Sequence, residues 1–502
     1  MKQINLSQEL RSGGRISSSR QAALALRLSV PAILAQFTNI IMEYIDAAMV
    51  GQLGAEASAS VGLVASSTWL IGGLVGAAVN GFSVQVAQAV GAGEEELSRS
   101  ILRQAITANL IFSVVLAVVC TGLSGQVPVL LGAGESIRKG ASGYLRIYSI
   151  FLPVISIQYL MILMLQCAGD MKTPGIGSVL ECLLNLVFNY LLIFPTHTVK
   201  LSGHTLRIPG AGLGVEGAAL GTVLSMSIVA VILTIVTLFF SDTLALWRPG
   251  RKAGKPSSAR PVRKAEAASS SARPVRKKGW IPQPVILKRA LHIALPIAGQ
   301  ETALTFAQVV STRIVAPLGA VAIAANSFAV TAEALCYMPG YGIGMAATTL
   351  VGQSYGAGRK DLAKSFAWMT TGLGMVLMGL SAVLMYFLCP FVFRFLTPDA
   401  QVQALGVSVL RIGILSEPLF GASIVGSGAL RGAGDTLVPA LISLSSIWGI
   451  RIVMAAVLIR SLGLQGVWIA MVCDLCVRGI FFLIRLKRGR WLKAGDGKPV
   501  QG

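Results

Sequence analysis

Two acidic residues lie inside a long apolar stretch near the start of the chain. The stretch covers residues 31–55, and Glu43 and Asp46 stand one helical turn apart within it. About 20 apolar residues are enough to cross the hydrocarbon core of a bilayer. An ionised side chain at its centre costs about 2.5–3.5 kcal/mol, so such residues face a cavity or a partner and commonly mark an ion path. We therefore expect this helix to carry a coupling ion.

Asp46 has the chemistry of a proton carrier. A carboxyl group in a poorly hydrated pocket favours its neutral form and can hold a proton. A cationic compound that enters the same pocket favours the charged form, so proton and compound compete for one charge. The alternative is that Asp46 pairs with a buried arginine and only joins helices. Glu43 either lines the same cavity or has a structural role.

A second polar stripe lies on another apolar segment. Glu181, Asn185 and Asn189 recur every fourth residue and share one helical face. We expect them to form the wall of a cavity that faces Asp46. The alternative is that they hydrogen-bond to neighbouring helices.

The second half of the chain carries similar groups. Glu333, Tyr337 and Tyr341 form a stripe that combines a carboxylate with aromatic faces, which suits a cationic amphiphile. Glu301 and Gln308 are further candidates for the lining of a substrate cavity. Packing against a neighbouring helix is the alternative for both sets.

Composition places the chain in a membrane. Of 502 residues 54% are hydrophobic and 13% are charged, which is about half the usual charged share of a soluble domain. The mean hydropathy is +0.72. The net charge of +21 comes mainly from the two tails and a central linker, which is the pattern of cytoplasmic segments. We therefore expect no nucleic-acid partner, and we place both termini in the cytoplasm of a cell with the chain in its inner (plasma) membrane.

Apolar runs predict an all-α polytopic membrane protein with twelve transmembrane helices. The predicted spans are 28–50, 58–88, 102–124, 144–167, 175–195, 214–240, 288–316, 321–350, 364–389, 404–430, 436–460 and 464–486. Asp474 and Arg478 lie four residues apart in the last span and are expected to pair.

The chain repeats itself. Pro31 matches Pro296 and Asp170 matches Asp435, and these and the other matched positions lie 265 residues apart. Later matches lie 249 apart, so the first half has about sixteen extra residues near 196–210. Six spans in each half give a parallel repeat, two lobes related by an axis along the membrane normal, with a cavity between them. The predicted parts are an N-terminal tail 1–27, a six-helix lobe 28–240, a linker 241–284, a second lobe 285–486 and a tail 487–502.

The linker is basic and repeats the motif Ala-Arg-Pro-Val-Arg-Lys at 259–264 and 272–277. Such a composition predicts a disordered cytoplasmic tether near anionic headgroups.

Enzyme chemistry has no support in the sequence. His197, His204 and His292 are the three histidines, and none lies deep in a predicted span. Cys473 and Cys476 have CxxC spacing but lie within an apolar helix, which argues against a redox or zinc site. No Walker loop is present. We expect no enzymatic activity, no cofactor and no metal.

The repeated motifs, taken in order, resemble the multidrug and toxic compound extrusion (MATE) family. The motifs are Asp46-Ala-Ala-Met-Val-Gly-Gln-Leu-Gly-Ala55, Gln166-Cys-Ala-Gly-Asp-Met-Lys-Thr-Pro174, Ala324-Ala-Asn-Ser327, Val351-Gly-Gln-Ser-Tyr-Gly-Ala-Gly358 and Gly428-Ala-Leu-Arg-Gly-Ala-Gly-Asp-Thr436, together with the Val-Gly-Ala-Gly turn that ends at Gly93. The resemblance implies a secondary active antiporter that exports cationic or amphipathic drugs in exchange for H⁺ or Na⁺ by alternating access. It also implies that Asp46, Asn185 and Asn189 form the ion-coupling site.

One departure from the family pattern bears on the ion. The NorM-like branch has an aspartate where this chain has Phe420, and Glu417 lies about a turn earlier, so it is not an aligned replacement. We therefore favour the DinF-like branch and H⁺ coupling, with Na⁺ as the alternative. The rival function within the superfamily is a lipid-linked oligosaccharide flippase, which would need a basic cavity. The expected partners are small-molecule drugs or toxic metabolites and membrane lipids, and we expect a monomer.

Overall fold

The structure is a computed structural model that describes residues 9–10, 14, 16–201, 204–247 and 279–494. The repeated linker motifs and most of the predicted tether lie outside these residues, as does part of the N-terminal tail. The predictions of disorder there are therefore untested. The lobe boundaries read from the sequence also stay predictions.

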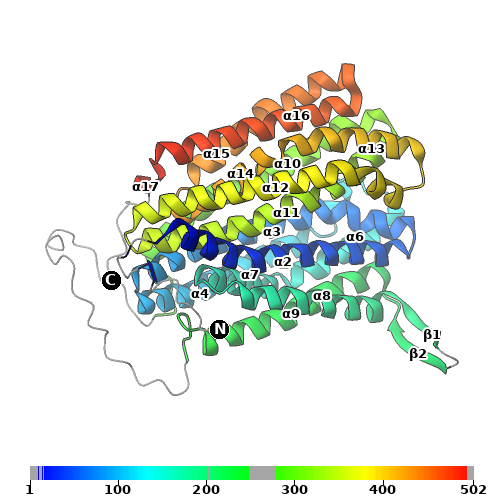
Figure 1. The fold of residues 1–502 in the computed structure, drawn as a ribbon. Helices are drawn as coiled ribbons and strands as arrows, with labels where there is room; N and C mark the ends of the chain where they lie inside the picture. Colours follow the sequence, from blue (N-terminus) through cyan, green and yellow to red (C-terminus); the bar gives the residue numbers. More distant parts are fainter. Residues whose placement is uncertain (1–8, 11–13, 15, 202–203, 248–278, 495–502) are drawn as a thin grey trace.

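Long helices run side by side along the whole molecule (Figure 1). The helical elements of the first half, short ones included, are α2 (Ser18–Gly51), α3 (Ala55–Ala92), α4 (Glu95–Leu123), α5 (Val127–Leu130), α6 (Glu135–Ile150), α7 (Leu152–Cys167), α8 (Lys172–Ile193), α9 (Gly214–Ile235) and the π-helical turn η1 (Val236–Phe240). Those of the second half are α10 (Pro284–Val315), the 3-10 turn η2 (Ala316–Leu318), α11 (Ala320–Gly356), α12 (Lys360–Leu396), α13 (Ala400–Gly413), the 3-10 turn η3 (Ile414–Ser416), α14 (Glu417–Gly432), α15 (Leu437–Ser446), the π-helical segment η4 (Ile447–Ile452), α16 (Val453–Arg488) and α17 (Trp491–Ala494).

The predicted all-α membrane fold with twelve spans is confirmed. Within the described residues, nine helical segments are long and apolar enough to cross a membrane, and α6 with α7 makes a tenth that is bent by 56°. The segment Leu437–Arg488 holds two crossings, because Gly463 takes a backbone conformation (φ 55°, ψ −136°) that ends one helix and starts the next. Helix α10, which carries more polar residues, completes the twelve.

Prolines mark the breaks inside two spans. Pro153 follows the bend between α6 and α7, and Pro418 follows η3, where α13 passes into α14. Proline lacks the backbone N–H that a continuous helix needs and clashes with the preceding turn. The polar residue Glu417, which begins α14, is thereby placed at a helix break inside the membrane region.

The extra residues of the first half form a β-hairpin. Strands β1 (Pro195–Leu201) and β2 (His204–Ala211) pair antiparallel and project from the bundle (Figure 1). The sequence predicted only a longer loop at this place. We call this end of the bundle the hairpin end, and the opposite end, where α17 lies, the α17 end.

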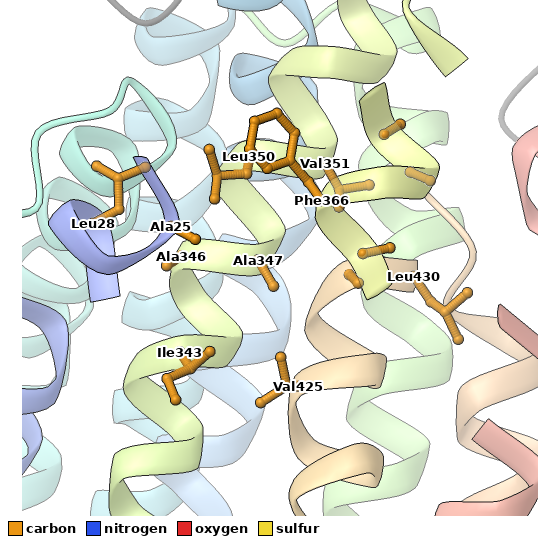
Figure 2. Packing of buried hydrophobic residues seen from close by; sticks show 14 of the residues in the cluster. Ala25, Leu28, Ile343, Ala346, Ala347, Leu350, Val351, Phe366, Val425 and Leu430 are labelled. Atoms are coloured by element: carbon orange, nitrogen blue, oxygen red, sulfur yellow. The ribbon is translucent and has the colours of Figure 1, made fainter. Parts of the chain in front are cut away.

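A buried apolar cluster joins the two halves at the α17 end. Figure 2 shows Ala25 and Leu28 of α2 beside Ala346 and Leu350 of α11, with Phe366 of α12 nearby. Burying apolar side chains across this junction stabilises the contact by about 25 cal/mol per Å². The halves are thus packed together at this end, and the candidate polar residues lie further along the same helices.

Candidate functional site

A network of amides holds Asp46 in the first half. Asp46 is half-buried on α2, and the buried Asn189 of α8 donates from Nδ2 to its Oδ1 at 2.6 Å. The same Nδ2 lies 3.1 Å from Oδ1 of Asn185, one turn earlier. Asn185 in turn donates to Oγ1 of Thr222 on α9 at 3.2 Å. The structure therefore brings together the three residues that the sequence proposed as the coupling site.

A glycine lets the third helix of this site approach. A Cβ atom at Gly221 of α9 would lie 2.1 Å from Oδ1 of Asn189, far inside van der Waals contact. Gly221 and the adjacent Thr222 were not identified from the sequence. No lysine or arginine in the described part of the chain pairs with Asp46, so the alternative of a buried ion pair finds no support there.

Glu181 has a different partner from the two asparagines. Its carboxylate is buried and accepts a hydrogen bond from Nε2 of Gln158 on α7 at 2.5 Å. This contact is the interhelical bond that the sequence analysis kept as an alternative. Gln158 was missed, because a single glutamine in an apolar helix has no pattern that assigns it a partner.

Glu43 remains open to solvent or to a cavity. Its side chain is exposed, whereas its neighbour Tyr44 donates from its hydroxyl to the backbone oxygen of Thr331 on α11 at 3.0 Å. The turn of α2 that leads into Asp46 is thus tied to the second half of the chain. An exposed Glu43 side chain agrees with the prediction that this residue lines a cavity.

Two buried carboxyl groups lie in the second half. Glu333 on α11 is 5% exposed and Glu417 at the start of α14 is fully buried. They lie close enough for their charges to repel. Oε1 of Glu333 and both carboxylate oxygens of Glu417 have no hydrogen-bond partner within the described residues. Glu417 was set aside because it did not match a family position. Its place before a proline in an apolar span is the signal that could have found it.

The aromatic part of the predicted stripe lies together. The rings of Tyr337 and Tyr341 have centroids 6.2 Å apart, and Tyr337 meets Phe420 of α14 at 5.6 Å. Tyr341 is partly exposed, and Glu333 at the other end of the stripe is buried. The stripe thus leads from an accessible ring to a buried carboxyl group.

Glu301 lies at the junction of the halves. A Cβ atom at Gly73 of α3 would lie 3.1 Å from Cβ of Glu301 on α10, so the two helices pass closely there. Gln308, which was proposed with it, is exposed two turns further along α10. The structure therefore does not bring Glu301 and Gln308 into one polar cluster.

Four residues join the halves by reciprocal hydrogen bonds at the α17 end. Gln88 of α3 donates from Nε2 to the backbone oxygen of Gly432 on α14 at 3.0 Å. Gln353 of α11 donates from Nε2 to the backbone oxygen of Cys167 on α7 at 2.9 Å. The two donors lie 265 residues apart, and so do the two acceptors. Each pair therefore occupies equivalent positions of the internal repeat. We call Gln88, Gln353 and their two carbonyl acceptors the interlobe latch.

Two glycines let the backbones touch beside the latch. A Cβ atom at Gly91 would lie 2.0 Å from the oxygen of Gln353, and one at Gly356 would lie 1.9 Å from the oxygen of Gln88. The sequence analysis described the Gly-Ala-Gly motif that ends at Gly93 as a turn, and Gly356-Ala-Gly358 is its repeat in the second half. That holds for Gly93 and Gly358, which have positive φ angles, but the first glycine of each motif serves close helix approach instead.

Comparison with known proteins agrees with this architecture. The MatE family profile matches residues 31–191 and 296–457, once in each half. The chain belongs to the MatE family. It is a multi-pass membrane transporter and not an enzyme.

Relatives of the family match over nearly the full length. The chain is 27% identical to "Probable multidrug resistance protein NorM" of Thermotoga maritima over 473 residues, covering 93% of this chain and 92% of the relative. It is 24% identical to "Multidrug resistance protein MdtK" of Yersinia pestis over 485 residues, covering 94% and 96%.

Solved structures share the fold. A structure described as the outward-facing conformation of a multidrug resistance MATE family transporter of the MOP superfamily has a TM-score of 0.82 at 20% identity and covers 98% of this chain and 100% of its own. A MOP superfamily transporter from Pyrococcus furiosus has the same TM-score at 19% identity, with the same coverage.

Proposed function

We propose that this MatE-family protein exports cationic, amphipathic compounds in exchange for H⁺, and that Asp46 carries the proton. The multidrug resistance names of its NorM and MdtK relatives support the substrate class. The observation that carries the proposal is the environment of Asp46, a half-buried carboxyl group whose partners are amides rather than cations.

In the proposed exchange, one negative charge serves two ligands in turn. When Asp46 is protonated, the pocket is neutral and has little affinity for a cation. When the proton leaves, Asn189 donates to the carboxylate and the uncompensated charge attracts a cationic compound. Competition between proton and compound for this charge couples their opposite movements.

The same geometry favours H⁺ over Na⁺. Hard metal cations are bound by several oxygen ligands. Asn189 presents its NH₂ group to Asp46, and this amide is held in that orientation by the oxygen of Asn185. Phe420 stands in α14 where the NorM-like branch would supply a carboxylate, which supports the DinF-like assignment and H⁺ coupling.

We further propose that the α17 end faces the cytoplasm of an inner (plasma) membrane. Basic residues gather in the connections at that end, among them Arg99, Lys172 and Arg359. The interlobe latch would then close the cytoplasmic side, and alternating access would require its four residues to separate.

The test is drug-driven proton release from proteoliposomes, recorded with a pH-sensitive dye, with and without Na⁺. We expect a cationic dye to release protons from the wild type in Na⁺-free buffer and Asp46→Asn to abolish the signal. The control variant is Glu56→Gln, which removes an exposed carboxylate from the first turn of α3 and is expected to behave as the wild type. Transport that requires Na⁺, or that survives Asp46→Asn, would overturn the proposal.

A further inference from the structure

A groove on the outer surface of the second half lies between α12 and the α13–α14 break. It has a volume of about 350 Å³ and is lined almost entirely by apolar atoms. Gly379 and Ala382 of α12 make its floor, and Val383, Phe387 and Leu415 make its exposed walls. Small residues on α12 and the irregular backbone of η3 thus leave a hollow on a surface that is otherwise filled by large side chains.

An arginine that pairs with no carboxylate of the described residues stands at one end of this groove. Arg411 of α13 lies one turn before Ile414 and Leu415, and its guanidinium carbon is 4.7 Å from the ring centroid of Tyr386, which lines the groove. Its Nε is buried without a hydrogen-bond partner, and within the described residues no carboxylate pairs with it. Stacking on the ring stabilises the cation by about 0.5–2 kcal/mol but does not neutralise it.

Three other arginines in this half are paired with carboxylates. Arg451 and Arg478 share the carboxylate of Asp474, and Arg485 pairs with Asp435 at 2.7 Å. A charge left unpaired in or near the hydrocarbon region is costly, and such residues pair with an anion or reach for the interface. Arg411 has no carboxylate partner among the described residues, so an external anion would complete its pairing.

Helix lengths place Arg411 just below the membrane surface. Residues 400–432 form one span of 33 residues, which is roughly 50 Å long against a hydrocarbon thickness of about 30 Å. About 10 Å then extends beyond each boundary. Arg411 lies roughly 16 Å from the first residue of α13, so its Cα is about 6 Å inside the boundary at the hairpin end. An arginine side chain spans that distance and can reach the headgroup region.

We infer that this groove binds an anionic phospholipid of the leaflet at the hairpin end. Arg411 binds the phosphate of the headgroup, and one acyl chain lies along the groove towards Gly379 and Pro418. The cation stands at the end of the groove nearer the membrane surface, and the apolar part of the groove extends towards the bilayer centre. A phospholipid has its charged headgroup and its acyl chains in the same order. The bound lipid would lie against the helix break that positions Glu417.

The test is native mass spectrometry of the delipidated full-length protein, titrated with phosphatidylglycerol or with phosphatidylethanolamine of the same acyl chains. We expect the wild type to retain phosphatidylglycerol about fivefold more than the zwitterionic lipid, as one cation near the membrane surface predicts. Arg411→Gln should remove this preference and Arg411→Lys should keep it. The matched control is Arg394→Gln, which removes an exposed cation near the same end of α12 and should leave the preference unchanged.

A second variant tests the groove without changing charge. A Cβ atom at Gly379 would meet only the Cγ of Pro418, at 3.4 Å, so Gly379→Leu can fill the floor without moving backbone. It should lower the binding of both phospholipids. Equal retention of phosphatidylglycerol by Arg411→Gln and wild type would overturn the inference, as would unchanged binding to Gly379→Leu. Displacement of phosphatidylglycerol by equimolar oleate, or by a cationic dye, would assign the groove to a different ligand and would also overturn it.

Discussion

Gln88 and Gln353 reach across the interface between the two halves in opposite directions, each to a carbonyl oxygen at the end of a helix in the other half. The two contacts are equivalent by the internal repeat but not identical. Arg289 of α10 donates to Oε1 of Gln88 at 2.5 Å. Oε1 of Gln353 has no hydrogen-bond partner in the part of the chain that the structure describes. One side of the latch is therefore held more firmly than the other.

Removing either glutamine should favour the open state of the α17 end. A neutral hydrogen bond contributes about 0.5–1.5 kcal/mol net, so Gln353→Ala should shift the closed-to-open ratio by roughly two- to tenfold. Gln88→Ala should shift it further, because it also leaves Arg289 without its acceptor. Cys167, which is 3% exposed, reports the opening through its reaction with maleimide in a variant that keeps this cysteine alone. The control is Gln308→Ala, on an exposed face of α10. Unchanged Cys167 reactivity in both glutamine variants would contradict the role of these glutamines in holding the α17 end closed.

A methyl group at either close-approach glycine should hold the halves apart. Gly91→Ala and Gly356→Ala each place a carbon about 2 Å from a backbone oxygen of the other half, and backbone cannot yield as a side-chain end can. We expect both variants to lose most drug efflux in a dye-accumulation assay while remaining in the membrane. Gly72→Ala, where nothing lies within 4 Å, should transport normally. Full efflux by Gly91→Ala would show that the two halves do not close this tightly during transport.

The ion cluster around Asp474 should dominate the stability of the last two spans. Asp474 is fully buried, accepts from Nε of Arg451 at 2.9 Å and from Ser446 Oγ at 2.5 Å, and pairs with Arg478 as the sequence predicted. Asp474→Ala leaves two arginines without their carboxylate and should cost about 3 kcal/mol or more, because an uncompensated buried charge remains. Thermal unfolding in detergent measures this loss.

The exposed pair of Asp361 with Arg359 provides the comparison. The carboxylate of Asp361 is 65% exposed, so Asp361→Asn should change stability by less than about 1 kcal/mol. If Asp474→Ala and Asp361→Asn lowered the free energy of unfolding equally, burial would not determine how much the Asp474 cluster contributes to stability.

The sequence by itself determined the membrane class, the twelve crossings and the twofold repeat. Each of these follows from local composition or from a constant spacing, which do not depend on how the helices pack. The nearness of Asp46 to Asn185 and Asn189 was also predictable in part. Residues every fourth position share a helical face, and the resemblance to the family paired that face with the first span.

Only the tertiary structure decided which polar groups meet. The bond from Gln88 to Gly432 joins residues 344 positions apart. The contact of Gln158 with Glu181 likewise depends on the rotation and depth of separate helices. Helical periodicity specifies the face on which a side chain lies, but it does not specify the neighbour that this face meets. In this protein the packing of glycines such as Gly91 and Gly221 sets those distances, and therefore it also sets which buried groups find a partner.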